Sequence, residues 1–232
     1  DFRARRITSY LNLLNELVTS RFNALKDGSR ESLKEIRACL NLLPDNAEVS
    51  SQFEALANRC DGLKNLRAWL DQNLSLGRID VNIMTKVDKA NYSRSGDQLP
   101  VEHNDAHAAL RGFAESELQA AVVFSAGMNP RLYGYASRFD SFLPSADGTF
   151  GKRIVLKVSD FRSAMIQGKF LAKKGLWVSE YRIESGLNCG GHAFATDGLL
   201  LGPILEEFRG RRDELRDAMG SLIRPALQAR GN

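Results

Sequence analysis

The chain has 232 residues, of which 43% are hydrophobic and 26% are charged, a balance typical of globular domains. A net charge of +4, spread among interspersed acidic and basic residues, is too small to indicate a nucleic-acid partner but suits a small anionic ligand. The three cysteines are far apart, which argues against a disulfide framework and favours a reducing cytoplasm. No apolar run approaches the roughly 20 residues that span a bilayer, so we expect no membrane partner.

Residues 1–76 have the apolar spacing of helices throughout. Ile7, Leu11 and Leu14 begin the first stripe, and further stripes follow after short breaks. Ser29 stands where it can cap the second helix. No residue of this region carries recognisable chemistry, so we interpret it as a helical N-terminal region that caps the rest of the chain.

Residues 77–232 alternate between strand-like and helix-like patterns. The β-rich runs are 79–87, 119–126, 153–159 and 177–185, and the helical patterns are 104–117, 129–142, 160–174, 199–208 and 213–227. Such alternation predicts α/β structure with parallel strands, in β/α units of the TIM-barrel type. A closed barrel of this type needs eight units, so we expect an incomplete barrel that further segments or subunits would complete.

Each predicted strand ends in small or polar residues. Because the carboxyl ends of parallel strands meet at one side of a sheet, we expect Ser125, Lys157 and Glu184 to lie in one cleft with the loop that follows the last strand. Two other strand-end residues, Asn129 and Asp160, are best explained as helix N-caps.

The loop after the last predicted strand is the most informative segment. It contains Gly186, the pair Gly190 and Gly191, and then His192. Glycines let a backbone approach a ligand closely, and histidine is suited to proton transfer near neutral pH. The same residues are also compatible with a plain tight turn followed by a surface histidine.

The segment ESGLNCGGH at 184–192 resembles the strand-end signature of FMN-dependent (β/α)8-barrel oxidoreductases of the nitronate monooxygenase (2-nitropropane dioxygenase) and flavin enoyl reductase type. The run LAKKG at 171–175 occupies the place of the helix end that precedes this strand in the family. The resemblance implies FMN as cofactor, a small-molecule substrate, and His192 as a catalytic base or hydrogen-bond donor. It also implies cofactor contacts from Gly190 and Gly191, to which we add Ser125, Lys157 and Glu184 as candidates.

The sequence departs from the family pattern in two places. Leu187, Asn188 and Cys189 separate Gly186 from the glycine pair, where the family places its acidic residue closer. The Ala-Gly-Gly-Ile segment with which the family binds the phosphate does not occur after His192. We therefore expect this chain by itself to bind FMN weakly or not at all.

Two further readings remain open. One is a barrel lyase, isomerase or aldolase without flavin, in which Lys86 or Lys157 supplies the amine and His192 the acid and base. The other is a non-catalytic scaffold that docks other subunits through residues 1–75. In addition, Cys189 could act as a nucleophile with His192 as its base, or be an inert buried thiol.

The segment EHNDAH at 102–107 is a second polar cluster. His103 and His107 are four residues apart, which predicts that they share a helix face at the spacing of two metal ligands. The segment is also an ordinary helix start, with Asn104 as the N-cap, and we favour this interpretation over a metal site.

Overall fold

The computed structural model describes residues 2–27, 29–43, 48–58, 62–145, 147–184 and 201–231. The chain forms two compact units, one made of Asn12–Arg78 and the other of Asp1–Leu11 together with Ile79–Asn232. The helix α1 (Phe2–Ala24) contributes to both, because its first residues cluster with the second unit. Within the described residues, no helix is both long enough and apolar enough to cross a membrane.

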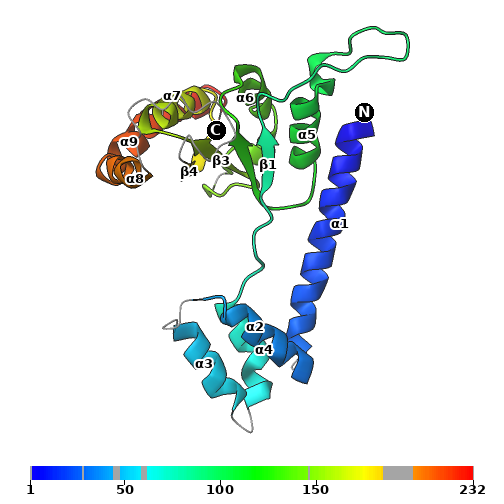
Figure 1. The fold of residues 1–232 in the computed structure, drawn as a ribbon, viewed down its shortest axis with the longest axis vertical. Coiled ribbons are helices and arrows are strands. Elements are labelled where there is room, and N and C mark those ends of the chain that lie inside the picture. Colours follow the sequence, from blue (N-terminus) through cyan, green and yellow to red (C-terminus); the bar gives the residue numbers. More distant parts are fainter. Residues whose placement is uncertain are drawn as a thin grey trace. The chain divides into compact units, whose positions relative to one another are not determined.

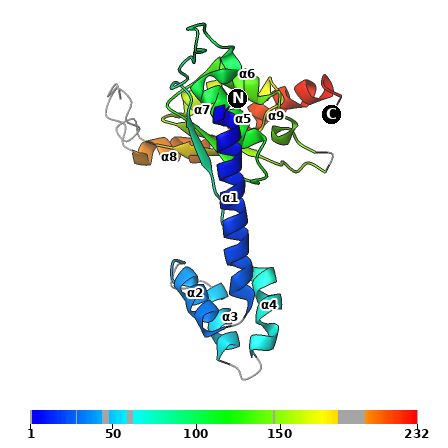
Figure 2. The ribbon, with the colours of Figure 1, turned by 90° about the vertical axis from the view of Figure 1, so that its right-hand side faces the viewer.

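The unit Asn12–Arg78 is a small helical bundle (Figure 1, Figure 2). After α1 and a short 3-10 turn (Leu25–Asp27) it contains α2 (Arg30–Leu40), α3 (Glu48–Ala57) and α4 (Gly62–Asn73). Its core consists of Ile36, Leu40, Phe53, Leu66 and Leu70. The hydroxyl oxygen of Ser29 accepts a hydrogen bond from the backbone N–H of Ser32, which confirms Ser29 as the cap of α2.

The second unit contains a sheet of four parallel strands in the order β1-β2-β3-β4. The strands are β1 (Val81–Met84), β2 (Ala121–Ser125), β3 (Arg153–Val158) and β4 (Val178–Ile183). Each lies inside one of the predicted β-rich runs. The predicted α/β class with parallel strands is therefore confirmed, and consecutive strands are neighbours throughout.

Helices connect and cover the strands (Figure 1). They are η2 (Val101–His103) with α5 (Asp105–Ala114), α6 (Pro130–Ala136) with η3 (Asp140–Phe142), α7 (Phe161–Ala172), α8 (Leu201–Gly210) and α9 (Arg212–Gln228). The predicted helix 129–142 is broken at Ser137, whose hydroxyl donates to the carbonyl of Gly134 as the chain tightens into 3-10 turns.

Two of the predicted caps are confirmed. The side chain of Asn129 accepts hydrogen bonds of 3.1 Å from the backbone N–H groups of Arg131 and Leu132 at the start of α6. The carboxylate of Asp160 accepts a hydrogen bond of 2.6 Å from the N–H of Ser163 in α7. Asn129 lies four residues after the end of β2 and Asp160 two residues after the end of β3, so each fixes where the next helix begins.

The two faces of the sheet differ in chemistry. One face packs on the helices through alternate residues of the inner strands, Val122, Phe124, Ile154, Leu156 and Val158, which belong to the main hydrophobic core. The other face carries only a small buried apolar cluster, Ala121, Val123 and Val155. Around this cluster lie Met84 and a set of polar side chains from the same face. We call this side the polar face, and its polar residues are Asp80, Asn82, Ser125, Arg153, Lys157, Glu180, Arg182 and Glu184.

Candidate functional site

Three residues that the sequence singled out, Ser125, Lys157 and Glu184, lie on the polar face. Lys157 lies near the carboxyl end of β3, and Glu184 follows β4 directly. Their charged groups form an ion pair, with Nζ of Lys157 2.5 Å from Oε1 of Glu184. Both side chains are about one quarter exposed, at 24% and 30%, so the pair remains accessible to a ligand.

Ser125 ends β2 at the same side of the sheet, but its hydroxyl is engaged differently. It is buried and donates a hydrogen bond of 2.6 Å to Oδ1 of Asn82 on β1. Asn82 is exposed, and its Nδ2 group makes no hydrogen bond to any residue the structure describes. The sequence did not single out Asn82, because a polar residue inside a β-rich run ordinarily faces solvent. The alternation of Val81, Asn82 and Ile83 was the available signal, since it places Asn82 on the opposite face from the core.

Arg182 joins the two outer strands across the polar face. Its guanidinium lies 2.6 Å from Glu180 on the same strand and 2.5 Å from Asp80, which precedes β1. The hydrogen bonds that Arg182 donates to these two carboxylates raise its pKa above the usual value. Three strand spacings amount to about 14 Å. An arginine and an aspartate do not bridge that distance on a flat sheet, so the sheet is twisted or curved between its outer strands.

The turn after β2 is tied to the end of β1. The hydroxyl of Thr85, which is fully buried, donates to the carbonyl oxygen of Ser125 at 3.0 Å and also to that of Gly127. In return, Nδ2 of Asn129 donates to the carbonyl of Thr85 at 2.8 Å. Between them Ala126 has a φ of 61°, a left-handed conformation that non-glycine residues adopt at some cost. These contacts fix the ends of two strands relative to each other, and with them the position of Ser125.

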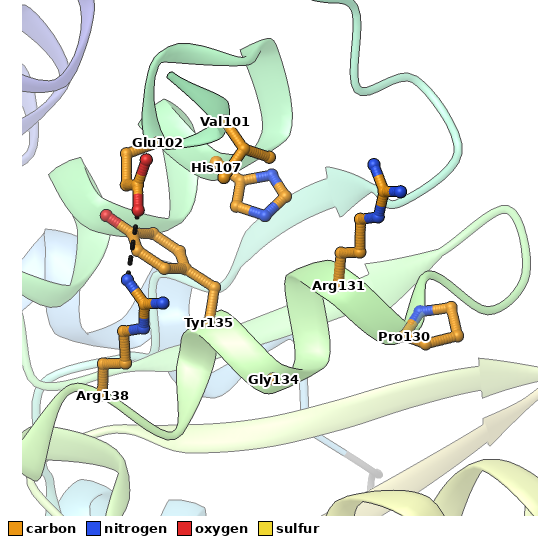
Figure 3. Close-up of a pocket in the computed structure, with 8 residues that line it drawn as sticks. All are labelled: Val101, Glu102, His107, Pro130, Arg131, Gly134, Tyr135 and Arg138. Atoms are coloured by element: carbon orange, nitrogen blue, oxygen red, sulfur yellow. Dashed lines mark hydrogen bonds and ion pairs between the residues drawn. The ribbon is translucent and has the colours of Figure 1, made fainter.

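A separate pocket of about 320 Å³ lies between α5 and α6 (Figure 3). The buried imidazole of His107 forms part of its wall, and Nδ1 lies 2.8 Å from Oδ2 of Asp88, although the ring is turned too far for an ideal hydrogen bond. The ring of His107 also packs on that of Tyr135, with ring centres 5.0 Å apart. We name this site the α5–α6 pocket; its lining residues are Val101, Glu102, His107, Pro130, Arg131, Gly134, Tyr135 and Arg138.

One prediction about the segment 102–107 is wrong, and a second is only partly confirmed. His103 and His107 do not share a helix face, because η2 ends at His103 and α5 begins only at Asp105. Asn104 is the N-cap residue of α5, as predicted, but its side chain makes no capping hydrogen bond. Oδ1 of Asp88 instead accepts from the backbone N–H groups of Ala106 and His107, at 2.9 and 3.3 Å, because the loop after β1 passes close to the helix start.

The sequence also singled out residues of the segment after β4, and Lys86, as catalytic or cofactor-binding candidates. Cys189, Gly190, Gly191 and His192 lie outside the residues that the structure describes. Lys86 is exposed in the turn after β1. Among the described residues, no group of three or more histidine, cysteine, aspartate or glutamate side chains is arranged to hold a metal ion.

Comparison with known proteins adds no relative from which a role could be transferred. The chain matches no protein-family model, no curated protein and no solved structure. The chemistry of the site therefore rests on the chain's own residues.

Proposed function

We propose that this chain is an FMN-dependent oxidoreductase, similar to nitronate monooxygenases, that acts on a small-molecule substrate in the cytoplasm. Its site lies on the polar face, at the carboxyl ends of the strands. One observation carries the proposal: Lys157, Glu184 and Ser125 end neighbouring parallel strands, and the last of these strands leads directly into the segment GLNCGGH. Parallel α/β sheets bind their ligands at this end.

We also propose that the four-stranded sheet forms part of the wall of a TIM-type barrel. In such a barrel, consecutive strands are neighbours and the sheet curves around an interior lined by alternate residues. The order β1-β2-β3-β4 and the contact from Arg182 to Asp80 across the polar face both support this. The polar face would then be the interior, and further segments or subunits would complete the wall.

Asn82 and Lys157 on the polar face suit the pyrimidine edge of a flavin ring. The pyrimidine edge of the flavin ring presents carbonyl oxygens and a ring nitrogen that accept hydrogen bonds and carry negative charge after reduction. The Asn82 amide and the Lys157 ammonium are donors of the matching kind, and Ser125 fixes the orientation of that amide through its own hydrogen bond. The buried apolar cluster beneath them is made of small side chains, which leave room above it.

The chain's own residues have separable roles in this proposal. FMN, when bound, supplies the electron transfer. Lys157 holds a positive charge beside the flavin ring, and Glu184 orients Lys157 through the ion pair. Gly190 and Gly191 allow close approach of the backbone, and His192 moves the proton that the substrate gives up.

The proton-transfer role is tested by His192→Ala, with His103→Ala as a control at a histidine outside the proposed site. We expect the flavin absorption bands of the flavin-loaded protein to be unchanged in both variants. The rate of flavin reduction by 2-nitropropane should fall about 10²–10⁴-fold in His192→Ala only, which is the usual contribution of a positioned acid or base. Unchanged reduction in His192→Ala would remove His192 from the mechanism.

A further inference from the structure

The α5–α6 pocket lies on the helix side of the sheet and is independent of the proposed flavin site. Its central feature is His107, a buried histidine held in place from several sides. Asp88 contacts Nδ1 and, through its other carboxylate oxygen, caps the helix on which His107 stands. Tyr135 packs against the ring. With Nδ1 directed to Asp88, the second ring nitrogen, Nε2, makes no hydrogen bond to any described residue and is left for the pocket.

The other charges in the pocket leave a positive excess. Arg138 is neutralised by Glu102, with 3.1 Å between Nη1 and Oε1, and also stacks over the ring of Tyr135. Arg131 is exposed and forms no ion pair with any residue the structure describes. Figure 3 shows the side chains of Arg131, on α6, and of Arg138, just after α6, on the side where Glu102 and His107 lie. The unmatched charge beside His107 is therefore the guanidinium of Arg131.

We propose that the α5–α6 pocket binds a small oxyanion, of the phosphate or carboxylate class. An oxygen of the ligand accepts a hydrogen bond from Nε2 of His107, and Arg131 pairs with the negative charge. Asp88 supports this arrangement because its carboxylate beside Nδ1 leaves Nε2 facing the pocket, and Nε2 donates when the ring carries a proton on both nitrogens. A volume of about 320 Å³ admits a ligand larger than the anion itself, with its apolar part against Val101 and Tyr135.

The test is a titration of the full chain with inorganic phosphate and, separately, with acetate, at constant ionic strength. The readout is the ring resonances of ¹⁵N-labelled histidine, with His107 assigned by the signal that is lost in His107→Gln. We expect a saturable shift of the His107 resonance with at least one of the two anions, and the tighter of them identifies the ligand class. Arg131→Gln should weaken that binding about tenfold, as the loss of one charge-assisted hydrogen bond implies.

Arg162→Gln is the matched control. Arg162 is also an exposed arginine at the second residue of its helix, α7, but it does not line the pocket. We expect this variant to bind the anion like the unmodified chain. The proposal is overturned if neither anion shifts the His107 resonance saturably, or if Arg162→Gln weakens binding as much as Arg131→Gln. Equal weakening would mean that general charge attraction explains the effect.

Discussion

At the scale of single residues, Gly112 shows how packing can require a glycine without any unusual backbone angle. It lies in α5, where a Cβ atom would stand 2.7 Å from the carbonyl oxygen of Ala4 and 2.8 Å from Cβ of Ile7. The hydroxyl of Thr8 also donates to the carbonyl of Gly112 at 3.0 Å. The first residues of α1 therefore rest directly on the backbone of α5.

We predict that Gly112→Ala destabilises the protein by about 1–3 kcal/mol, the usual cost of forcing an extra carbon into a packed contact. Gly220→Ala is the matched control, because Gly220 lies inside α9 with no atom near its hypothetical Cβ. There the higher helix propensity of alanine should stabilise by about 0.5–1 kcal/mol. Urea unfolding measures both changes, and equal effects of the two substitutions would contradict this account of Gly112.

Lys152 is a buried cation at the amino end of β3. Its ammonium group donates to the carbonyls of Ser116 and Leu118, at 2.8 and 2.7 Å, and lies over the ring of Phe113. Burial lowers the pKa of Lys152 from 10.5 to about 8. Between these two values the unfolded chain binds the proton that the folded chain has released, so stability should rise with pH across this window.

We therefore predict that the free energy of unfolding of the unmodified chain rises between pH 8 and about 9.5 relative to that of Lys152→Met, which has no such titration. Burial raises the pKa of Tyr133 and Tyr181, so the titration of these tyrosines would itself change the stability at higher pH. The pH range therefore stops below the ordinary pKa of tyrosine. Urea unfolding at a series of pH values gives the comparison. A constant difference between the two proteins would show that Lys152 keeps its ordinary pKa.

At the scale of elements, the start of α5 depends on a residue outside the helix. Asp88 accepts from two backbone N–H groups of the first turn, whereas Asn104, at the cap position itself, makes no capping hydrogen bond. We predict that Asp88→Ala lowers the free energy of unfolding by about 1–2 kcal/mol, the cost of losing a cap, and that Asn104→Ala costs clearly less. The reverse order in urea unfolding would show that Asn104 is the effective cap.

At the scale of the whole molecule, local patterns were enough to predict the strands and most helices of the sheet unit. Each strand lies in a short apolar run followed by polar residues, and the caps Asn129 and Asp160 act within three residues of their own positions. Such signals depend only on neighbouring residues, so they can be recognised in a single sequence. The alternation of strands and helices then implies parallel pairing.

Features that depend on distant partners could not be predicted in this way. The contact of Arg182 with Asp80 joins residues 102 apart, and Asp88 caps a helix 18 residues further along the chain. The spacing of His103 and His107 suggested one helix face, but the break at Asn104 places them in different elements. These three cases share a cause: tertiary structure decides which of several plausible partners a polar side chain finds.

The central claim is that the polar face near Lys157 binds the flavin ring. The most direct measurement is a flavin fluorescence titration of the full chain with riboflavin and FMN, comparing Lys157→Met with the exposed control Lys173→Met. Because the sequence lacks the family's phosphate-binding segment, the account predicts weak, saturable and nearly equal binding of the two flavins, reduced severalfold only in Lys157→Met. Tight, stoichiometric binding of FMN but not of riboflavin would contradict this claim. Flavin binding that Lys157→Met leaves unchanged would also contradict it.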